Sequence, residues 1–318
     1  MLKAIYLLDP EAYALTYLPA IRAEIAELVE IGTHLHEAQV VLSGRGCPKL
    51  DQAFLNTAPN LRVIFFGKGS VKGLVTDAFW ERGITLVGAN SAMAVAVAEY
   101  ALSQILFSLK QGWQHALAMK QERVQTRNFY VPGTYGTTVG VVSLSQVGRR
   151  VCELLGPFDM RVIAYDPYVQ DGGANGVMDV SMVSLEALFA QADVVTLHAP
   201  LLPATRGMVT RAHLASMKPN ATLINTARGG LIQQDELIEV LRQRPDLFAV
   251  LDVTEPEPLP QDSPLFEMPN VVLTPHIAGP LNHEYARMGH LMADELRRYI
   301  NGESLHYQIT RERADILA

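Results

Sequence analysis

Residues 137–149, Thr137-Thr-Val-Gly-Val-Val-Ser-Leu-Ser-Gln-Val-Gly-Arg149, form the stretch that decides the fold. Its apolar run Val139–Val142 is typical of a buried strand. From Gln146 onward, apolar residues recur at helical spacing, so a helix is predicted to follow the strand closely. A strand, a tight turn and a helix N-terminus together make a layout that binds a dinucleotide pyrophosphate, because free backbone N–H groups and the helix dipole face the anion.

The turn itself departs from the usual fingerprint Gly-x-Gly-x-x-Gly. Ser143 and Ser145 occupy the first two glycine positions, and only Gly148 remains. Ser145 is the more serious departure, because a glycine there lets the backbone approach the pyrophosphate. The turn alone is therefore weak evidence, and the rest of the chain must decide whether it binds a cofactor.

Composition excludes several classes of protein. The chain has 318 residues, of which 49% are apolar, enough for two domains with ample cores. A net charge of −7 and a pI near 5.7 argue against a nucleic-acid partner. Cys47 and Cys152 have neither metal-site nor redox-motif spacing, which fits a reducing compartment. The apolar segment 92–109 contains Glu99 and Gln104, so a buried helix is favoured over a membrane span. We expect a soluble cytoplasmic protein without a membrane partner.

The first ninety residues alternate between strand and helix patterns, which predicts a parallel sheet covered by helices. Strands are predicted at 4–8, 39–42, 61–66 and 84–87, and helices at 20–31 and 71–82. A long helix is predicted at 92–122, followed by a linker at 123–136. Because the first half of this helix is apolar almost all round, we expect it to form the interface of a homodimer.

A second series of strands and helices begins near residue 138 and has the size of a complete Rossmann domain. Its strands are predicted at 138–143, 160–165, 193–197, 221–225, 247–252 and 271–274. The clearest helices between them are predicted at 146–156, 184–190 and 234–243. Residues 253–270 are rich in proline and acids and are predicted to be a loop. An amphipathic helix at 283–301 ends the pattern.

Polar residues follow every predicted strand of this second series. In an open parallel sheet, ligands bind outside the carboxyl ends of the strands, so these residues would gather at one edge. In chain order they are the Ser145/Gly148 turn, Asp166, His198, Thr226 to Arg228, Asp252 with Glu257, and His276. Loops at strand ends are polar in any case. An arginine, a glutamate and a histidine beside a helix N-terminus are more than that tendency requires.

Two of these residues have competing interpretations. Asp166 follows Ser145 by about 20 residues, where the fingerprint expects an acid that binds the adenosine ribose hydroxyls and disfavours NADP. Alternatively, it is an ordinary strand-end Asp that begins a turn. Arg228 could hold a carboxylate through two parallel hydrogen bonds. The alternative is a surface arginine paired with Asp235 or Glu236.

His276 and Glu257 also have competing interpretations. His276 is either functional or a structural histidine with satisfied hydrogen bonds. His283 and His290 follow it at seven-residue intervals, yet His276 precedes the predicted helix, so no metal site is expected. Glu257 lies in an acidic, proline-rich loop, and Glu255 is as good a candidate on composition. Spacing alone pairs neither with His276.

These motifs together resemble the D-isomer-specific 2-hydroxyacid dehydrogenase family over nearly the whole chain. The resemblance implies an α/β fold with two Rossmann-like parallel-sheet domains, in which the cofactor domain (94–285) is inserted into a flavodoxin-like substrate domain (1–93 and 286–318). The stretches that carry it are Thr137–Arg149, Tyr165–Pro167, Leu197–Thr205, Met217–Gly230, Leu251–Val253, Pro256–Pro258 and Pro275–Gly279.

The resemblance also implies roles for individual residues. The catalytic residues would be Arg228, Glu257 and His276, since the Pro-Glu-Pro spacing selects Glu257, as in glyoxylate/hydroxypyruvate reductases. Arg228 and His276 would also bind substrate, together with backbone N–H groups of Lys68, Gly69 and Ser70. The NAD-binding residues would be Ser145, Gln146, Val147, Gly148, Asp166, His198, Pro200, Thr205, Thr226, Ala227, Asp252 and Ala278.

The implied function is an NAD(H)-dependent oxidoreductase that interconverts a small 2-oxo acid and a D-2-hydroxy acid. Two alternatives are an NADPH-preferring glyoxylate or hydroxypyruvate reductase and a corepressor-like, non-catalytic sensor of nicotinamide nucleotides. Lys68 could extend specificity to a second anionic group, or it could be a solvated loop lysine. Ser145 could donate its hydroxyl to a phosphate oxygen, and Ser145→Gly is expected to tighten NADH binding.

Overall fold

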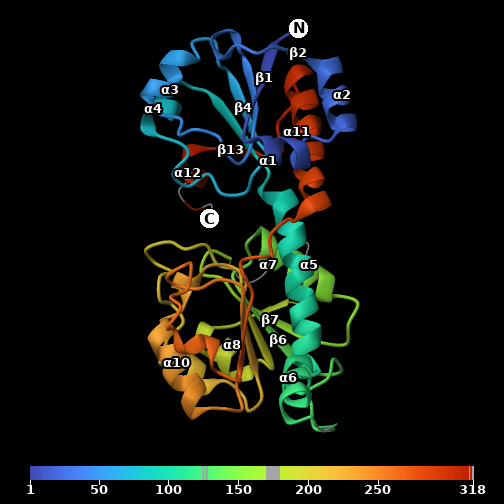
Figure 1. Ribbon diagram of the computed structural model, residues 1–318, viewed down its shortest axis with the longest axis vertical. Coiled ribbons are helices and arrows are strands. Elements are labelled where there is room, and N and C mark those ends of the chain that lie inside the picture. The colour runs from blue at the N-terminus through green and yellow to red at the C-terminus, as the bar shows by residue number, and fades with distance from the viewer. Residues whose placement is uncertain (124, 126–127, 170–179, 315, 317–318) are drawn as a thin grey trace. The chain divides into compact units, whose positions relative to one another are not determined.

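The computed structural model describes residues 1–318 except 124, 126–127, 170–179, 315 and 317–318. Contacts between residues divide the chain into two compact units, shown in Figure 1. One comprises residues 1–94 and 280–318, and the other comprises residues 95–279. The predicted second boundary, after residue 285, therefore falls inside the first unit.

The first unit is built on a six-stranded sheet in the order β13-β5-β4-β3-β1-β2. All pairings are parallel except that of β13 with β5. Strands β1 to β5 have the order 2-1-3-4-5 of flavodoxin-like folds. The strands are β1 (Lys3–Leu7), β2 (Glu30–Ile31), β3 (Val40–Ser43), β4 (Val63–Phe66), β5 (Thr85–Gly88) and β13 (Gln308–Ile309).

Helices cover both faces of this sheet because successive strand residues point to opposite sides. Ile64 packs with α3 and α4 on one face, whereas Val63 and Phe65 pack with α2 and α11 on the other (Figure 1). The helices of this unit are α1 (Pro10–Thr16), α2 (Pro19–Leu28), α3 (Gln52–Thr57), α4 (Asp77–Glu81), α11 (Tyr285–Ile300) and α12 (Arg311–Ala314), with 3₁₀ turns η1 (Leu35–Glu37) and η4 (Asn282–Glu284).

The second unit is built on a seven-stranded, all-parallel sheet in the order β12-β11-β10-β9-β6-β7-β8. From β6 the chain adds strands first on one side and then, from β9, on the other. This reversal is the switch point at which such sheets bind ligands. The strands are β6 (Thr138–Val142), β7 (Arg161–Tyr165), β8 (Val180–Met182), β9 (Val194–Leu197), β10 (Thr222–Asn225), β11 (Phe248–Leu251) and β12 (Val271–Leu273).

The second sheet is also covered on both faces. Helices α8, α9 and α10 pack on one face, and α5 and α7 pack on the other. The remaining elements are α5 (Asn90–Leu109), α6 (Gly112–Glu122), α7 (Gln146–Leu155), α8 (Leu185–Gln191), α9 (Arg211–Ser216), α10 (Gln234–Gln243), η2 (Gly229–Leu231) and η3 (Pro264–Phe266). The predicted α/β architecture with two parallel sheets is confirmed.

Three predicted helices differ from the structure. The helix predicted at 71–82 is reduced to α4, because Gly73 adopts a positive φ of 77° that ends any helix. The helix predicted at 92–122 is broken into α5 and α6 at Gln111, whose φ is 48°. The helix predicted at 20–31 ends at Leu28, and Glu30–Ile31 form the edge strand β2.

Helix α5 is long and apolar enough to cross a membrane, with a mean hydropathy of 1.6. Half of that apolar window is buried inside the protein, as expected for the core helix of a soluble fold. Ala98, Ala101, Ile105 and Leu109 are fully buried against the second sheet. The burial favours the interpretation of α5 as a core helix.

Candidate active site

The turn after β6 is held by Asp166. Its carboxylate accepts hydrogen bonds from Leu144 N (2.8 Å), Ser143 Oγ (3.1 Å) and Tyr168 N (2.9 Å). Ser143 adopts a φ of 76°, in the left-handed region that glycine prefers. The bond to Asp166 therefore supports a backbone conformation that a serine rarely adopts. A carboxylate can accept about four hydrogen bonds, so Asp166 keeps capacity for a ligand hydroxyl.

Ser145 caps the N-terminus of α7, where its Oγ accepts a bond from Gly148 N (3.3 Å). The same hydroxyl donates to the carbonyl oxygen of His198 (2.9 Å). A serine hydroxyl has one proton, so it is not available to a phosphate oxygen, in contrast to the expectation from sequence. Ser145 instead ties the turn to the loop that follows β9.

The first turn of α7 is open to an anion. Among the described residues, the backbone N–H groups of Gln146 and Val147 have no acceptor. A Cβ atom at Gly148 would lie 2.0 Å from the carbonyl oxygen of Ser143, so only glycine fits there. The retained glycine and the two N–H groups fit a pyrophosphate at this helix N-terminus.

Two buried polar atoms beside the switch point have no hydrogen-bond partner among the residues that the structure describes. His198 is buried, and its Nε2 contacts Thr196 Oγ1 at 3.0 Å while Nδ1 has no hydrogen bond. Burial lowers the pKa of His198 to about 3, so the ring is neutral at physiological pH. Thr226 Oγ1 is likewise buried and unpartnered. Such atoms at the ends of β9 and β10 fit a polar ligand such as a dinucleotide.

Thr205 shapes the loop after β9. Its Oγ1 donates to the carbonyl oxygen of Pro200 (2.5 Å) and accepts from Leu202 N (2.8 Å). The hydroxyl is thus engaged within its own loop. Cofactor contacts of Pro200, Thr205, Ala227 and Ala278 remain predictions from the sequence.

Arg228 is placed by a neighbour that sequence reasoning did not single out. Asn225 ends β10, donates through Nδ2 to the carbonyl oxygen of Arg228 (2.9 Å) and accepts from Ala227 N (3.0 Å). The backbone of Gly229 lies so close to Thr254 that a Cβ atom would fall 2.0 Å from its carbonyl carbon. A polar residue at a strand end was the available signal for Asn225.

The Arg228 side chain is mostly buried, and Nη1 donates to the carbonyl oxygen of Ala227 (2.6 Å). Burial lowers the pKa of this guanidinium, and the negative charge of Glu257 acts in the opposite direction. In the described part of the chain Arg228 forms no ion pair, and Glu236 instead accepts a bond from Arg211 N. The alternative of a surface arginine paired with Asp235 or Glu236 is therefore not what the structure has.

Glu257 and His276 meet directly. The distance between Glu257 Oε1 and His276 Nδ1 is 2.6 Å, and both side chains are partly exposed. Glu255 points elsewhere, with Oε1 at 3.7 Å from Arg206 Nη1. The structure thus separates two glutamates that composition left equivalent. Both members of the pair line a pocket of about 540 Å³, together with Leu259, Phe266, Leu273 and other residues.

Asp252 holds the loop that carries His276. Its buried carboxylate accepts from Thr274 Oγ1 (2.5 Å), Ile277 N (2.8 Å) and Ala278 N (2.8 Å). His276 itself has a φ of 55°, a strained conformation for a residue with a side chain. The structure therefore gives Asp252 a loop-holding role, and its predicted contact with the nicotinamide remains a prediction.

The predicted carboxylate donors of the first unit lie in the loop after β4. The backbone N–H of Lys68 already donates to the carbonyl oxygen of Phe66 (2.7 Å), which leaves those of Gly69 and Ser70 without an acceptor among the described residues. The Lys68 side chain is exposed and has no ion pair in the described chain. Arg45, after β3, is instead neutralised by Asp9 (2.8 Å) and Glu11 (2.5 Å).

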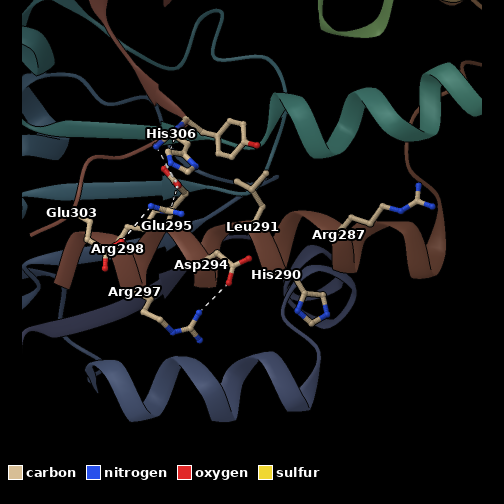
Figure 2. Close-up of a pocket in the computed structure, with 10 residues that line it drawn as sticks. Arg287, His290, Leu291, Asp294, Glu295, Arg297, Arg298, Glu303 and His306 are labelled. Carbon is tan, nitrogen blue, oxygen red and sulfur yellow. Dashed lines mark hydrogen bonds and ion pairs between the residues drawn. The ribbon is translucent and has the colours of Figure 1, made fainter. Parts of the chain in front are cut away.

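A second polar pocket, of about 680 Å³, lies along α11 (Figure 2). Its arginines are paired: Arg297 with Asp294 (3.0 Å), and Arg298 with Glu303 (3.3 Å) and Glu295 (3.7 Å). The buried Glu295 also accepts two backbone bonds, from the N–H groups of residues 306 and 307. These groups satisfy one another, so the pocket is not a candidate site. No metal-binding cluster of three His, Cys, Asp or Glu residues occurs among the described residues.

The chain is similar to known proteins over most of its length. Residues 102–278 match the family described as D-isomer specific 2-hydroxyacid dehydrogenase, NAD binding domain. The chain is 33% identical over 289 residues to a D-3-phosphoglycerate dehydrogenase of Methanocaldococcus jannaschii, covering 88% of this chain and 55% of that protein. It is 32% identical over 266 residues to an (S)-sulfolactate dehydrogenase of Chromohalobacter salexigens, covering 80% of this chain and 82% of that one.

A solved structure shares the fold. The NAD-complexed form of a D-isomer specific 2-hydroxyacid dehydrogenase from Lactobacillus delbrueckii ssp. bulgaricus is 21% identical, with a TM-score of 0.81 over 98% of this chain and 100% of that one. At this identity the likeness supports the fold alone. The chain spans about half the length of the phosphoglycerate dehydrogenases that it matches.

Proposed function

The chain belongs to the D-isomer-specific 2-hydroxyacid dehydrogenase family, and we propose that it interconverts a small 2-oxo acid and a D-2-hydroxy acid with NAD(H) as cofactor. The observation that carries the proposal is the 2.6 Å contact between Glu257 and His276. It occurs in the unit that also holds Arg228 and the open N-terminus of α7.

The cofactor would be held by groups that keep free hydrogen-bonding capacity in the described part of the chain. Backbone N–H groups of Gln146 and Val147 would bind the pyrophosphate, with Gly148 allowing its close approach. Asp166 would accept bonds from the ribose hydroxyls and repel a 2′-phosphate, which disfavours NADPH. His198, neutral and buried, would donate or accept without adding charge. When bound, the nicotinamide supplies or accepts the hydride.

Arg228 and His276 would stabilise the charge that develops on the substrate. The partly buried guanidinium of Arg228 has no carboxylate partner in the described part of the chain, so it can bind the substrate carboxylate and polarise the adjacent carbonyl. Burial strengthens this interaction because fewer water molecules screen it. A buried cation that lacks a protein partner is what a carboxylate substrate requires.

His276 would move the proton. Glu257 accepts a hydrogen bond at Nδ1, so this nitrogen keeps its proton and Nε2 is left to exchange one with the substrate. During reduction Nε2 would donate a proton to the developing alkoxide, and during oxidation it would take one from the hydroxyl. Glu257 orients the ring through this bond.

The substrate class follows from the first unit. Lys68 is exposed and has no ion pair among the described residues, whereas the neighbouring cation Arg45 is neutralised. We propose a substrate with a second anionic group, which Lys68 recognises. Relatives of the chain are named for phosphoglycerate and sulfolactate, and both names denote acids of this kind. Lys68→Gln should then raise KM for such acids about fivefold and leave KM for pyruvate unchanged, since an ion pair contributes on the order of 1 kcal/mol.

A homodimer is proposed through α5 and α6. Phe107, Leu117 and Met119 expose 42%, 38% and 55% of their surfaces on these helices, and a second copy would remove this apolar surface from water. Light scattering should give twice the chain mass for the wild type and the chain mass for Met119→Glu. The protein is proposed to be soluble and cytoplasmic.

The enzyme proposal is tested by NADH oxidation against a panel of 2-oxo acids, with His276→Gln as the control. We expect turnover with at least one acid and a loss of about 10²- to 10⁴-fold in the variant. Tight NADH binding without turnover of any acid would instead support a non-catalytic sensor of nicotinamide nucleotides.

A further inference from the structure

A chain of hydrogen bonds connects helix α5 to the loop of His276. Tyr100 Oη lies 3.0 Å from Thr274 Oγ1, and Thr274 Oγ1 donates to Asp252 Oδ1 at 2.5 Å. A hydroxyl has one proton, and that of Thr274 is given to the carboxylate. Tyr100 must therefore be the donor of the first bond, so the chain runs in one direction from Tyr100 to Asp252.

The end of this chain fixes the backbone around His276. The Asp252 carboxylate also accepts from Ile277 N and Ala278 N, both at 2.8 Å. His276 N donates to the carbonyl oxygens of Asp252 and Thr274, both at 3.0 Å. The loop is thus bonded on each side of a histidine whose φ is 55°. A non-glycine residue keeps such a conformation only when its surroundings hold it there.

The start of the chain is rigid. Tyr100 lies on α5 between Ala98 and Ala101, which are fully buried in the core of the second unit. Its ring is partly buried, and burial, followed by the charge of Asp252, raises the pKa of its hydroxyl, which the bond to Thr274 partly offsets. The phenol therefore stays protonated and able to donate.

We propose that Tyr100 and Thr274 are positioning residues, which fix the His276 loop so that Nδ1 remains on Glu257 while Nε2 faces the substrate. This inference rests on the proposed function of His276. Neither side chain needs to touch the substrate. Their effect should therefore appear in kcat, because a displaced proton donor slows the chemical step more than it weakens binding.

The test compares steady-state kinetics of four variants with the wild type at saturating NADH. Tyr100→Phe should lower kcat about three- to tenfold, the effect of one hydrogen bond, with an unchanged Kd for NADH. Thr274→Val, which breaks both bonds, should lower kcat further, and Thr274→Ser should restore most of it. Ser103→Ala is the matched control, since it removes an α5 hydroxyl that donates only to the carbonyl oxygen of Tyr100.

A mutant cycle separates positioning from general destabilisation. In a His276→Gln background, Tyr100→Phe should have no further effect on the residual rate, because the group it positions is gone. Wild-type kcat in Tyr100→Phe, or an equal loss in both backgrounds, would overturn the inference. If Tyr100→Phe does not fold, the contrast between Thr274→Val and Thr274→Ser decides. An inactive wild type would reject the proposed function as well, whereas an active wild type with an unaffected Tyr100→Phe rejects this inference alone.

Discussion

The pocket along α11 and the carboxyl edge of the second sheet both gather charged side chains, yet they differ in how many of these groups have partners. Along α11, Arg297 and Arg298 are paired with acids, and Glu295 is bonded to backbone N–H groups (Figure 2). At the sheet edge, Arg228 has no carboxylate partner and His198 Nδ1 has no hydrogen bond within the described residues. The α11 pocket is the larger, at about 680 Å³ against about 540 Å³.

The difference teaches where function should be sought. Burying an unpaired polar or charged group costs free energy, so such groups persist where a ligand completes them. The α11 cluster is explained by structure alone, because it bonds the helix to the segment before β13. Pocket size would have selected the wrong cluster, whereas the unpartnered atoms His198 Nδ1 and Thr226 Oγ1, next to Arg228, point to the sheet edge.

The largest expected effect comes from replacing one arginine in each of the two regions, Arg228 at the sheet edge and Arg298 in the α11 pocket. Arg228→Gln should lower kcat/KM about 10²- to 10³-fold, because it removes the charge that binds the substrate carboxylate. Arg298→Gln, in the α11 pocket where the arginine is already paired with acids, should change kcat/KM less than twofold. Equal losses in the two variants would contradict the assignment of the site.

The same contrast can be made with acids. Glu257→Gln should lower kcat roughly 10- to 100-fold, because a neutral amide replaces the carboxylate that holds the proton-transferring ring of His276. Glu303→Gln removes an acid from the α11 pocket and should leave kcat unchanged. Steady-state rates for the two variants, measured side by side, check this expectation.

The long strands of both sheets could be predicted from the sequence, whereas the hydrogen bonds between their ends could not. Strands β4 (Val-Ile-Phe-Phe) and β11 (Phe-Ala-Val-Leu) are short apolar runs, so they could be found from the sequence pattern alone. The very short strands β2 and β13 have no periodicity to detect. Gly73 gave a signal for the end of a helix that the apolar pattern outweighed.

Residues at strand ends could be predicted as a set, because parallel strands bring them to one edge. Their pairings could not. The choice between Glu255 and Glu257 depends on which carboxylate reaches His276, a distance that spacing does not contain. Tyr100 and Thr274 are 174 residues apart in the sequence, so no local sequence pattern predicts the hydrogen bond between them.

The stability of the protein at acid pH tests whether the buried His198 at the sheet edge stays neutral in the folded state. The pKa of His198 is about 3 in the folded protein and 6.5 when unfolded, so the unfolded state binds more protons between these values. Protonation of His198 therefore does not affect the free energy of unfolding above pH 6.5. Below pH 6.5 it lowers that free energy by about 1.4 kcal/mol per pH unit, down to pH 3.

Urea unfolding between pH 4 and pH 7.5 measures this slope. His198→Gln should flatten it, whereas substitution of the exposed His290 of the α11 pocket by Gln should retain it. A slope unchanged in His198→Gln would show that this ring is not the group that titrates.

The smallest expected effect is that of Ser145→Gly, in the turn after β6, on the Kd for NADH. From the fingerprint alone, Ser145→Gly is expected to tighten NADH binding. The structure predicts the opposite, a roughly threefold weaker Kd, because the variant loses both the helix cap and the bond to the His198 carbonyl oxygen. Fluorescence titration with NADH decides between the two signs.

The central claim is that the unsatisfied groups of the second unit carry out a D-specific reduction. The most direct measurement is a single turnover of the enzyme–NADH complex with a 2-oxo acid, followed by chiral analysis of the product. The account predicts one D-2-hydroxy acid for each NADH oxidised, and no product from His276→Gln with NADH still bound. An L-2-hydroxy acid, or unchanged product formation in His276→Gln, would contradict it.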